Sequence, residues 1–436
     1  MKQCFVSTCI CLAALGSMTL NTHSSEAPAA GTNVVTLDAL VSGVMEKNPE
    51  LKFYQAEMAA ARAGARNAGR LAAPELDTTV GHKRARDDIN RFSGEGMAWS
   101  VALRQPIEWP GRLGLRKAIA NRDVALAELG LARFRTALLS RIRSLGYELI
   151  VAQQRAAAGR AVAERFRELR QVLVARDPAG LTPLLETRVI EASGVKAEHT
   201  AAEAEHDVEH LTIQINYLGG QAPATPLRLA ETTPQFHPAP ALEILYTAAA
   251  SNNFELRLRV AEFEQQGFKV ALARNERFPS FNVGPFFSEE NASDRERIVG
   301  LAVSFPIPVW QNNRSKVEVA NARRAQAEAA LESARRQVER DVTDIWHEYE
   351  HARSVLAKWR PDAIEHFREA AETADRHYRL GAVPVATYIE LQRHYIEAVE
   401  ALLEARKEAL EAAQQLELLT GLPAPLASTI AKEENR

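Results

Sequence analysis

Apolar residues spaced alternately by four and three positions form the same seam twice in this 436-residue chain, 200 residues apart. The two copies are Leu138, Ile142, Leu145, Leu149, Ala152 and Ala156, and Val338, Val342, Ile345, Tyr349, Ala352 and Leu356. This spacing is typical of helices that pack along one stripe. Pro106-Ile107 likewise recurs as Pro306-Ile307, and Gly180 as Gly381. A duplication of this length is one structural unit used twice, rather than a short solenoid repeat.

Two segments in each half alternate between apolar residues and small or polar ones, which predicts β-strands with two different faces. They lie within residues 74–106 and 279–306, and a polar loop from Ser288 to about Arg297 is expected in the second pair. The apolar face should include Trp99, Val101, Leu103, Val299, Leu301 and Val303. Each strand is about as long as one that crosses a bilayer in a barrel, 9–11 residues. Soluble hairpins with one face on a core would show the same periodicity, but the small and hydrophilic opposite faces favour a water-filled lumen.

Long stretches without proline follow each strand pair and predict long helices. They run from Gly111 to Asp177, from Val309 to Arg360 and from the residue after Pro384 to about Thr420. A continuous helix over the first stretch would approach about 100 Å in length.

The remaining segments are shorter or irregular. Leu37 to about Leu71 is helical in pattern, with Asp38 as a candidate cap and Pro49 as a break. Several prolines between Thr225 and Pro240 predict an irregular linker, and the tail after Gly421 is expected to be poorly ordered.

The first residues have the pattern of an export signal: Lys2, an apolar run from Phe5 to Leu20, and small residues around Ala27. The expected organisation is a signal peptide (1–27), a first repeat (28–222), a linker (223–240), a second repeat (241–422) and a C-terminal tail (423–436). All three cysteines, Cys4, Cys9 and Cys11, lie in the signal. The mature chain is therefore expected to have no disulfide, thiolate nucleophile or cysteine metal site.

The charge balance argues against a nucleic-acid partner, and the hydropathy argues against transmembrane helices. With 53 basic and 56 acidic residues the net charge is -3, which argues against nucleic acid as a main partner. No later segment has the continuous apolar stretch of a transmembrane helix, so entry into a membrane would require strands. Four strands cannot close a barrel, and open edges are not tolerated in lipid, so the chain would pool eight strands as a dimer or twelve as a trimer.

Two motifs stand at equivalent points of the two copies, and a third lies at a turn in the second copy. Residues 105–112, Gln-Pro-Ile-Glu-Trp-Pro-Gly-Arg, lead from strand to helix, and Phe305-Pro306-Ile307-Pro308-Val309-Trp310 with Asn312-Asn313-Arg314 does so in the second copy. Residues 378–381, Tyr-Arg-Leu-Gly, lie at a helix–helix turn. In their order and spacing these motifs resemble the TolC family of outer-membrane efflux proteins, most closely its CzcC-like heavy-metal branch, over nearly the whole mature chain.

The resemblance implies a mainly α fold with a β-barrel portion, built from a duplicated helix–strand–strand–helix–helix unit. In a homotrimer, twelve strands would form an outer-membrane barrel surrounded by lipid and continued by a periplasmic α-helical barrel. Such a channel passively conducts solutes, heavy-metal cations among them, and needs no cofactor. It receives them through a periplasmic adaptor (membrane fusion) protein from an inner-membrane RND-type pump. The adaptor would meet the helical tips at Gly180, Leu181, Leu380, Gly381 and Ala382.

The resemblance also suggests a periplasmic entrance. Glu186 and Glu390 follow the two tip glycines, and in a trimer they would form rings of carboxylates that attract cations. Thr387 and Val383 stand where relatives resembling TolC itself carry an acidic residue and an arginine, so the ion-pair lock of those relatives is not expected here. Solvated helix faces would explain both glutamates equally well.

The competing hypotheses are that the protein is an enzyme or a soluble scaffold. His347-Glu348-Tyr349-Glu350-His351 fits the H-E-x-x-H pattern of zinc metalloproteases, but its copy 200 residues earlier has no histidine, which favours an ordinary helix. His206 and His210 are one turn apart among glutamates, which is more typical of a solvated face than of a metal site. A periplasmic coiled-coil adaptor or scaffold would share the helices but would not explain two strand pairs with lumen-like faces. We therefore expect neither catalysis nor a bound metal.

Overall fold

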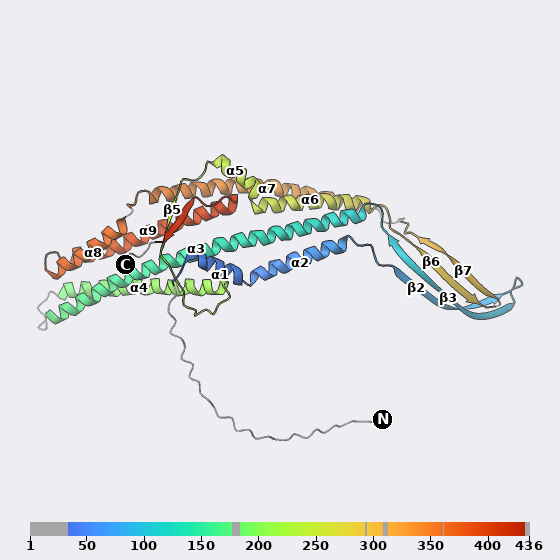
Figure 1. The fold of residues 1–436 in the computed structure, drawn as a ribbon, viewed down its shortest axis with the longest axis horizontal. Helices are drawn as coiled ribbons and strands as arrows, with labels where there is room; N and C mark the ends of the chain where they lie inside the picture. The colour runs from blue at the N-terminus through green and yellow to red at the C-terminus, as the bar shows by residue number, and fades with distance from the viewer. Residues whose placement is uncertain (1–33, 177–183, 293, 308–312, 361, 432–436) are drawn as a thin grey trace, which may run out of the picture.

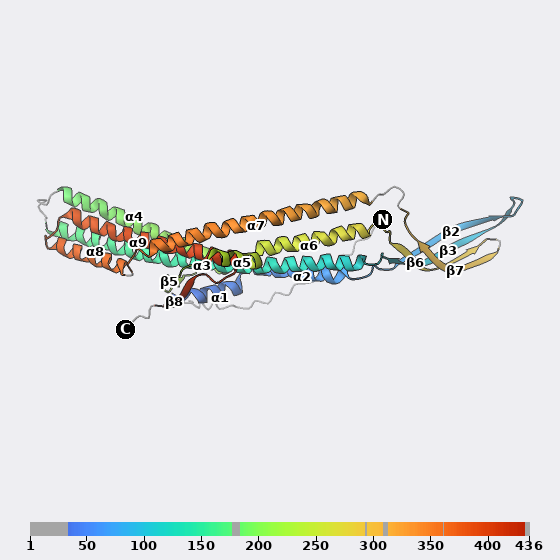
Figure 2. The ribbon, with the colours of Figure 1, turned by 90° about the horizontal axis from the view of Figure 1, so that it is seen from above.

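The computed structural model describes residues 34–176, 184–292, 294–307, 313–360 and 362–431. They form an elongated molecule with a four-stranded sheet at one end and helical hairpins at the other (Figure 1). Seen at right angles, several short helices and strands gather midway along its length (Figure 2). Sheet and hairpins therefore lie at opposite ends of long helices.

The sheet contains β2 (Glu75–Arg86), β3 (Phe92–Ile107), β6 (Phe281–Asn291) and β7 (Arg295–Ser304), in that order and all antiparallel. The predicted strand pairs are confirmed. The polar loop expected from Ser288 to Arg297 is wrong, because Asn291 already pairs with Arg295. Charged residues extend these strands: Glu289 accepts hydrogen bonds from Nε of Arg295 at 2.8 Å and of Arg297 at 3.0 Å.

Long helices extend from the sheet toward the other end of the molecule, and the proline-free stretches predicted such helices. They are α2 (Glu50–Ala68), α3 (Arg112–Arg176), α4 (Leu184–Leu218), α6 (Phe254–Asn275), α7 (Arg314–Leu356), α8 (Ala363–Arg379) and α9 (Val385–Thr420). The 65 residues of α3 correspond to about 100 Å of helix. The second copy differs, because α7 and α8 divide the path that α3 follows without interruption, and the sequence has Pro361 between them.

Two asparagines show the duplication in atomic detail. Asn48 caps α2 by accepting from the backbone N–H of Glu50 at 3.0 Å, and Asn253 caps α6 by accepting from that of Glu255 at 3.0 Å. The two side-chain amides donate to the carbonyls of Leu218 (3.0 Å) and Leu419 (2.9 Å), respectively. Each asparagine therefore joins the start of one helix to the end of another.

The first helix begins differently from the prediction. In α1 (Leu37–Lys47), Thr36 is the cap, and its hydroxyl accepts from the N–H of Ala39 at 3.3 Å. Asp38 lies inside the first turn, where its charge still favours the helix dipole. Pro49 separates α1 from α2, as predicted.

Small strands and α5 (Leu242–Asn252) occupy the middle of the molecule. β1 (Val34–Val35) pairs with β4 (Arg228–Leu229), and β5 (Thr232–Phe236) pairs with β8 (Leu426–Ala431). The prediction that the linker is irregular and the tail poorly ordered is therefore wrong for these residues. The two segments order each other, because each supplies the hydrogen-bonding edge that the other needs.

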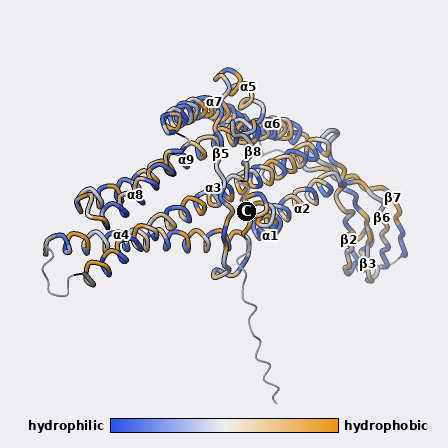
Figure 3. Tube along the Cα trace, turned by 60° about the vertical axis from the view of Figure 1, so that its left-hand side comes forward, coloured by the Kyte–Doolittle hydropathy of each residue, from blue (hydrophilic) through white to orange (hydrophobic). Residues whose placement is uncertain are grey.

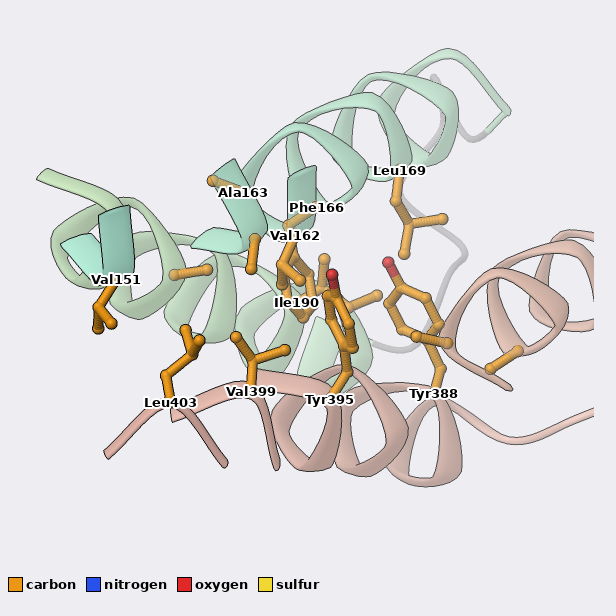
Figure 4. Close-up of a cluster of buried hydrophobic side chains, with 14 of the residues drawn as sticks. Val151, Val162, Ala163, Phe166, Leu169, Ile190, Tyr388, Tyr395, Val399 and Leu403 are labelled. Carbon is orange, nitrogen blue, oxygen red and sulfur yellow. The ribbon is translucent and has the colours of Figure 1, made fainter. Parts of the chain in front are cut away.

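The predicted seams form the cores between the helices. Ile142 and Leu149 in the first copy, and Val342 and Tyr349 in the second, have no exposed surface. Near the hairpin end, α3, α4, α8 and α9 enclose a further cluster that includes Phe166, Ile190 and Tyr388 (Figure 4).

Hydrophobic and hydrophilic positions alternate along the helices (Figure 3). Within the described parts of the chain, no helix combines the length and the apolarity needed to cross a membrane.

Candidate functional site

The strand register places the predicted apolar positions on one face of the sheet, which we call the apolar face. Val101 lies opposite Thr78 in β2 and Phe287 in β6, and Phe287 lies opposite Val299 in β7. Directly opposed residues project to the same side. The rings of Trp99 and Phe287 accordingly lie 5.2 Å apart. The shared face of Trp99, Val101, Leu103, Val299, Leu301 and Val303 is confirmed.

The opposite face carries small residues and paired charges. Ser100 and Ala102 belong to it on β3, and Gly300 on β7 lies under the ring of Phe286, which would be 2.7 Å from an added Cβ. Two ion pairs join strands on this face. Arg104 on β3 lies 2.8 Å from Asp77 on β2, and Lys83 on β2 lies 2.5 Å from Glu290 on β6. A face of this kind suits contact with water.

Two edges of the sheet are open. Among the described residues, β2 pairs only with β3, and β7 only with β6. Large apolar side chains remain exposed beside these edges, including Val80 on β2 and Val299 on β7 at 70% and 77% of their surface. Unpaired backbone groups next to exposed apolar residues require a partner edge in any apolar solvent.

The strand-to-helix motif connects the two copies. The ring of Trp109 stacks on Phe278 with centroids 4.6 Å apart. Arg112 donates to the backbone carbonyl of Phe278 at 2.6 Å, and Asn275 donates to that of Pro110 at 3.0 Å. These contacts explain why Trp109-Pro110-Gly111-Arg112 stands where the sheet meets the helices.

The turn between α8 and α9 forms one tip of the molecule. Gly381 has φ 75°, a left-handed conformation that glycine adopts without steric cost. Its N–H donates to the carbonyl of Tyr378 at 2.9 Å and the N–H of Ala382 to that of His377 at 2.9 Å, which is the hydrogen-bond pattern of a Schellman motif. Leu380 is 80% exposed there. Gly180 and Leu181 lie outside the described residues.

The predicted entrance residues have different surroundings. Glu186 lies in the first turn of α4 and is partly buried. The pKa of Tyr378 on α8 is raised by the burial of the tyrosine itself and by the nearby negative charge of Glu186. Glu390 on α9 is exposed and lies 3.7 Å from both Arg393 and His394 on the same helix. Thr387 is also exposed, one turn before Glu390.

Sequence reasoning missed the polar contacts that join the two hairpins. Arg379 on α8 lies 2.9 Å from Asp375 on the same helix and 2.9 Å from Glu168 on α3. On α9, the fully buried Gln392 donates to the carbonyl of Ala371 at 2.8 Å and accepts from Arg165 at 3.1 Å. The Arg379–Glu168 and Gln392–Arg165 contacts have no sequence signal, because the partners lie more than 200 residues apart.

Residues of the H-E-x-x-H segment on α7 form structural hydrogen bonds to the chain segment that precedes α5. Tyr349 is buried, and its hydroxyl donates to the carbonyl of His237 at 2.5 Å. Glu350 accepts from the N–H of Ala239 at 2.9 Å and is paired with Arg353. These contacts fasten the segment before α5 to α7, while His347, Glu348 and His351 point to the exposed side.

The described ranges hold no group of three or more His, Cys, Asp or Glu side chains that could bind a metal ion. His210 on α4 instead lies 3.1 Å from the amide of Gln214.

An open-edged sheet with one apolar face, continued by long helices that end in hairpins, defines the protomer of an elongated membrane channel. The sequence family described as "Outer membrane efflux protein" matches residues 40–220 and 245–422, one match in each copy of the duplication. The chain belongs to this family.

Similarities to individual known proteins support the family assignment. The chain is 22% identical to the cobalt-zinc-cadmium resistance protein CzcC of Cupriavidus metallidurans over 291 residues, which are 66% of this chain and 67% of that protein. A membrane protein from Pseudomonas aeruginosa has the same fold, with a TM-score of 0.72 at 18% identity, covering 89% of this chain and 91% of that one. The channel protein CusC has a TM-score of 0.70 at 14% identity, covering 89% and 92%.

The protein is therefore an outer-membrane channel component of an efflux system that extends into the periplasm. It is a transport component rather than an enzyme, and the soluble-scaffold alternative is not favoured. The family resemblance inferred from the sequence motifs is confirmed.

Proposed function

We propose that three copies of the chain assemble into one channel whose twelve strands close a barrel in the outer membrane. The observation that carries this proposal is the four-stranded sheet with two open edges and one apolar face. Closure through β7 of one protomer and β2 of the next removes both edges and keeps every neighbour antiparallel. Two copies would close eight strands, and the resemblance to trimeric relatives favours three.

Native mass measurement in mild detergent tests this assembly. We expect a single species of three chains, because no exposed strand edge remains. A stable monomer, or a species of two chains, would contradict the proposal.

We infer that the hairpin tips bind a periplasmic adaptor, which connects the channel to an inner-membrane pump of the RND type. The exposed Leu380, the left-handed Gly381 and the adjacent Ala382 support a contact surface at one tip. Gly180 and Leu181 would contribute the equivalent surface at the other tip. The placement of the sheet and of the hairpins at opposite ends supports this role, because only the end away from the membrane sheet can reach a periplasmic partner (Figure 1).

Glu186, Thr387 and Glu390 are proposed to line the narrow periplasmic end. Three copies of each glutamate would lower the electrostatic potential there and favour cations over anions. The exposure of Glu390 supports this assignment, and its contacts with Arg393 and His394, both at 3.7 Å, leave the side chain at the surface.

The proposed solutes are heavy-metal cations. The relative CzcC is a cobalt-zinc-cadmium resistance protein, which supports this solute class. If this chain has the same solute class, deleting it should raise the sensitivity of its host to these metals, and the Glu390 variant described below should restore resistance only in part. The export signal (1–27) and the division into repeats at 28–222 and 241–422, with linker and tail, remain predictions.

A further inference from the structure

Basic residues continue the apolar face at the turn end of β2. Beyond Val80, His82 and Arg84 project to the same side as Trp99, because they lie opposite Met97 and Glu95 in β3. Glu95 is 3.3 Å from His82 and 3.1 Å from Arg84. The side chain of Arg84 is nevertheless 72% exposed, so most of its guanidinium remains available.

A second basic pair lies at the turn end of β7. Arg295 and Arg297 precede Val299 at alternate positions, and Arg297 lies opposite Glu289, which lies opposite Trp99. The carboxylate of Glu289 is only 8% exposed and holds both arginines through their Nε atoms. The arginine side chains are 58% and 55% exposed, and Arg297 donates no other hydrogen bond within the described residues.

The two basic groups stand on the two open edges of one sheet, β2 and β7. When the sheet closes by pairing with copies of itself, β7 of one protomer lies next to β2 of its neighbour, and the two basic groups, which share the turn end and the apolar face, meet at each seam. We propose that each seam binds the phosphate group of an outer-leaflet lipid. The site rests on the proposed trimer, since one chain supplies only half of it.

The chemistry favours a phosphate held by lipid. Guanidinium groups bind phosphate oxygens through pairs of parallel hydrogen bonds. Three arginines outnumber Glu95 and Glu289, so the seam keeps a net positive charge. The opposite face at the same end has the reverse balance, because Lys83 meets both Glu290 and Glu296, at 2.5 and 3.5 Å.

The position of the arginines selects a lipid over a soluble anion. They follow directly after the apolar residues that would contact acyl chains, on the same face and at the end of the sheet farthest from the helices (Figure 1). A headgroup phosphate reaches this level while its acyl chains cover Val80 and Val299.

Native mass spectrometry of the detergent-purified trimer tests the proposal, with bisphosphorylated lipid A and its dephosphorylated form as probes. We expect retention of the phosphorylated form only. Arg84→Gln should weaken its binding about tenfold, as expected for the loss of one charge-assisted contact. The double variant Glu289→Gln/Arg297→Gln should do the same without leaving a buried carboxylate unpaired. Lys83→Gln, at the same end but on the opposite face, is the matched control and should bind normally.

Three results would overturn the proposal: equal retention of both lipids, equal loss in Lys83→Gln and Arg84→Gln, or displacement of the lipid by millimolar inorganic phosphate. The same spectrum reports the number of chains. A monomer would therefore reveal failure of the assembly, whereas a trimer without lipid would reveal failure of the phosphate site alone.

Discussion

At the scale of single residues, the same asparagine performs the same two tasks in each copy. Asn48 and Asn253 cap one helix with the side-chain oxygen and hold the last turn of another with the side-chain amide. The carbonyl partners lie 170 and 166 residues away. Sequence comparison aligns the residues beside them, but the double role follows only from the distant carbonyls.

The inside–outside assignment of the strands gives the first prediction. Leu301→Arg places a charge on the apolar face and should cost about 2–4 kcal/mol of membrane stability. The matched change Ser100→Arg lies on the opposite face, where water can solvate the guanidinium, and should assemble almost normally. The measurement is the yield of folded protein in outer-membrane fractions. Equal losses for both variants would mean that the two faces have been assigned the wrong way round.

At the scale of elements, sequence patterns predicted the strands and long helices because apolar and polar positions recur with a regular period along each of them. The period of two in β3 and the four-three seam of α3 are local signals. The predictions failed where distant segments decide. Pairing of Glu289 with arginines extends β6, and β5 is a strand because β8 lies beside it. For the same reason the contact of Arg379 with Glu168 could not be foreseen.

The α8–α9 tip gives a prediction about the adaptor. Gly381→Arg should abolish efflux in cells, because it adds bulk and charge to the proposed contact surface, while the purified protein still conducts ions. No neighbour lies within 4 Å of an added Cβ, so only the left-handed φ is strained, at about 1–2 kcal/mol. Gly381→Ala carries the same strain without the charge and should retain efflux. If Gly381→Arg supports normal efflux, the tip is not the adaptor contact.

At the scale of the whole molecule, the duplication places a sheet at one end and hairpins at the other, about one α3 length apart (Figure 1). Sheet and hairpin must therefore act in different compartments if the sheet enters the outer membrane. The sequence predicted this polarity through the order of its elements. The partner surfaces could not be derived in the same way, because they are completed by copies of the chain and by other proteins.

The charge at the periplasmic end gives a prediction for the assembled channel. Glu390→Gln removes one carboxylate from each protomer and should lower cation-over-anion selectivity in planar bilayers without changing the yield of trimer. Glu397→Gln is the control, since Glu397 contacts the same Arg393 and His394 but lies two turns farther from the tip. Unchanged selectivity in Glu390→Gln would make Glu390 an ordinary solvated residue of α9.

Engineered cysteines can show whether β7 of one protomer pairs with β2 of the next. Thr78→Cys on β2 is combined in turn with Val299→Cys, Leu301→Cys or Val303→Cys on β7, all on the apolar face. Within one chain the two strands are separated by β3 and β6, a distance of about 14 Å. That distance is too large for a disulfide, so any bond must join different chains.

We expect that at least one of the three pairs, oxidised in membranes, gives a ladder of cross-linked chains that ends at the trimer. Thr78→Cys with Ala302→Cys, which projects to the opposite face, should remain uncross-linked. Monomers alone in all three pairs, or a ladder that stops at the dimer, would contradict the claim.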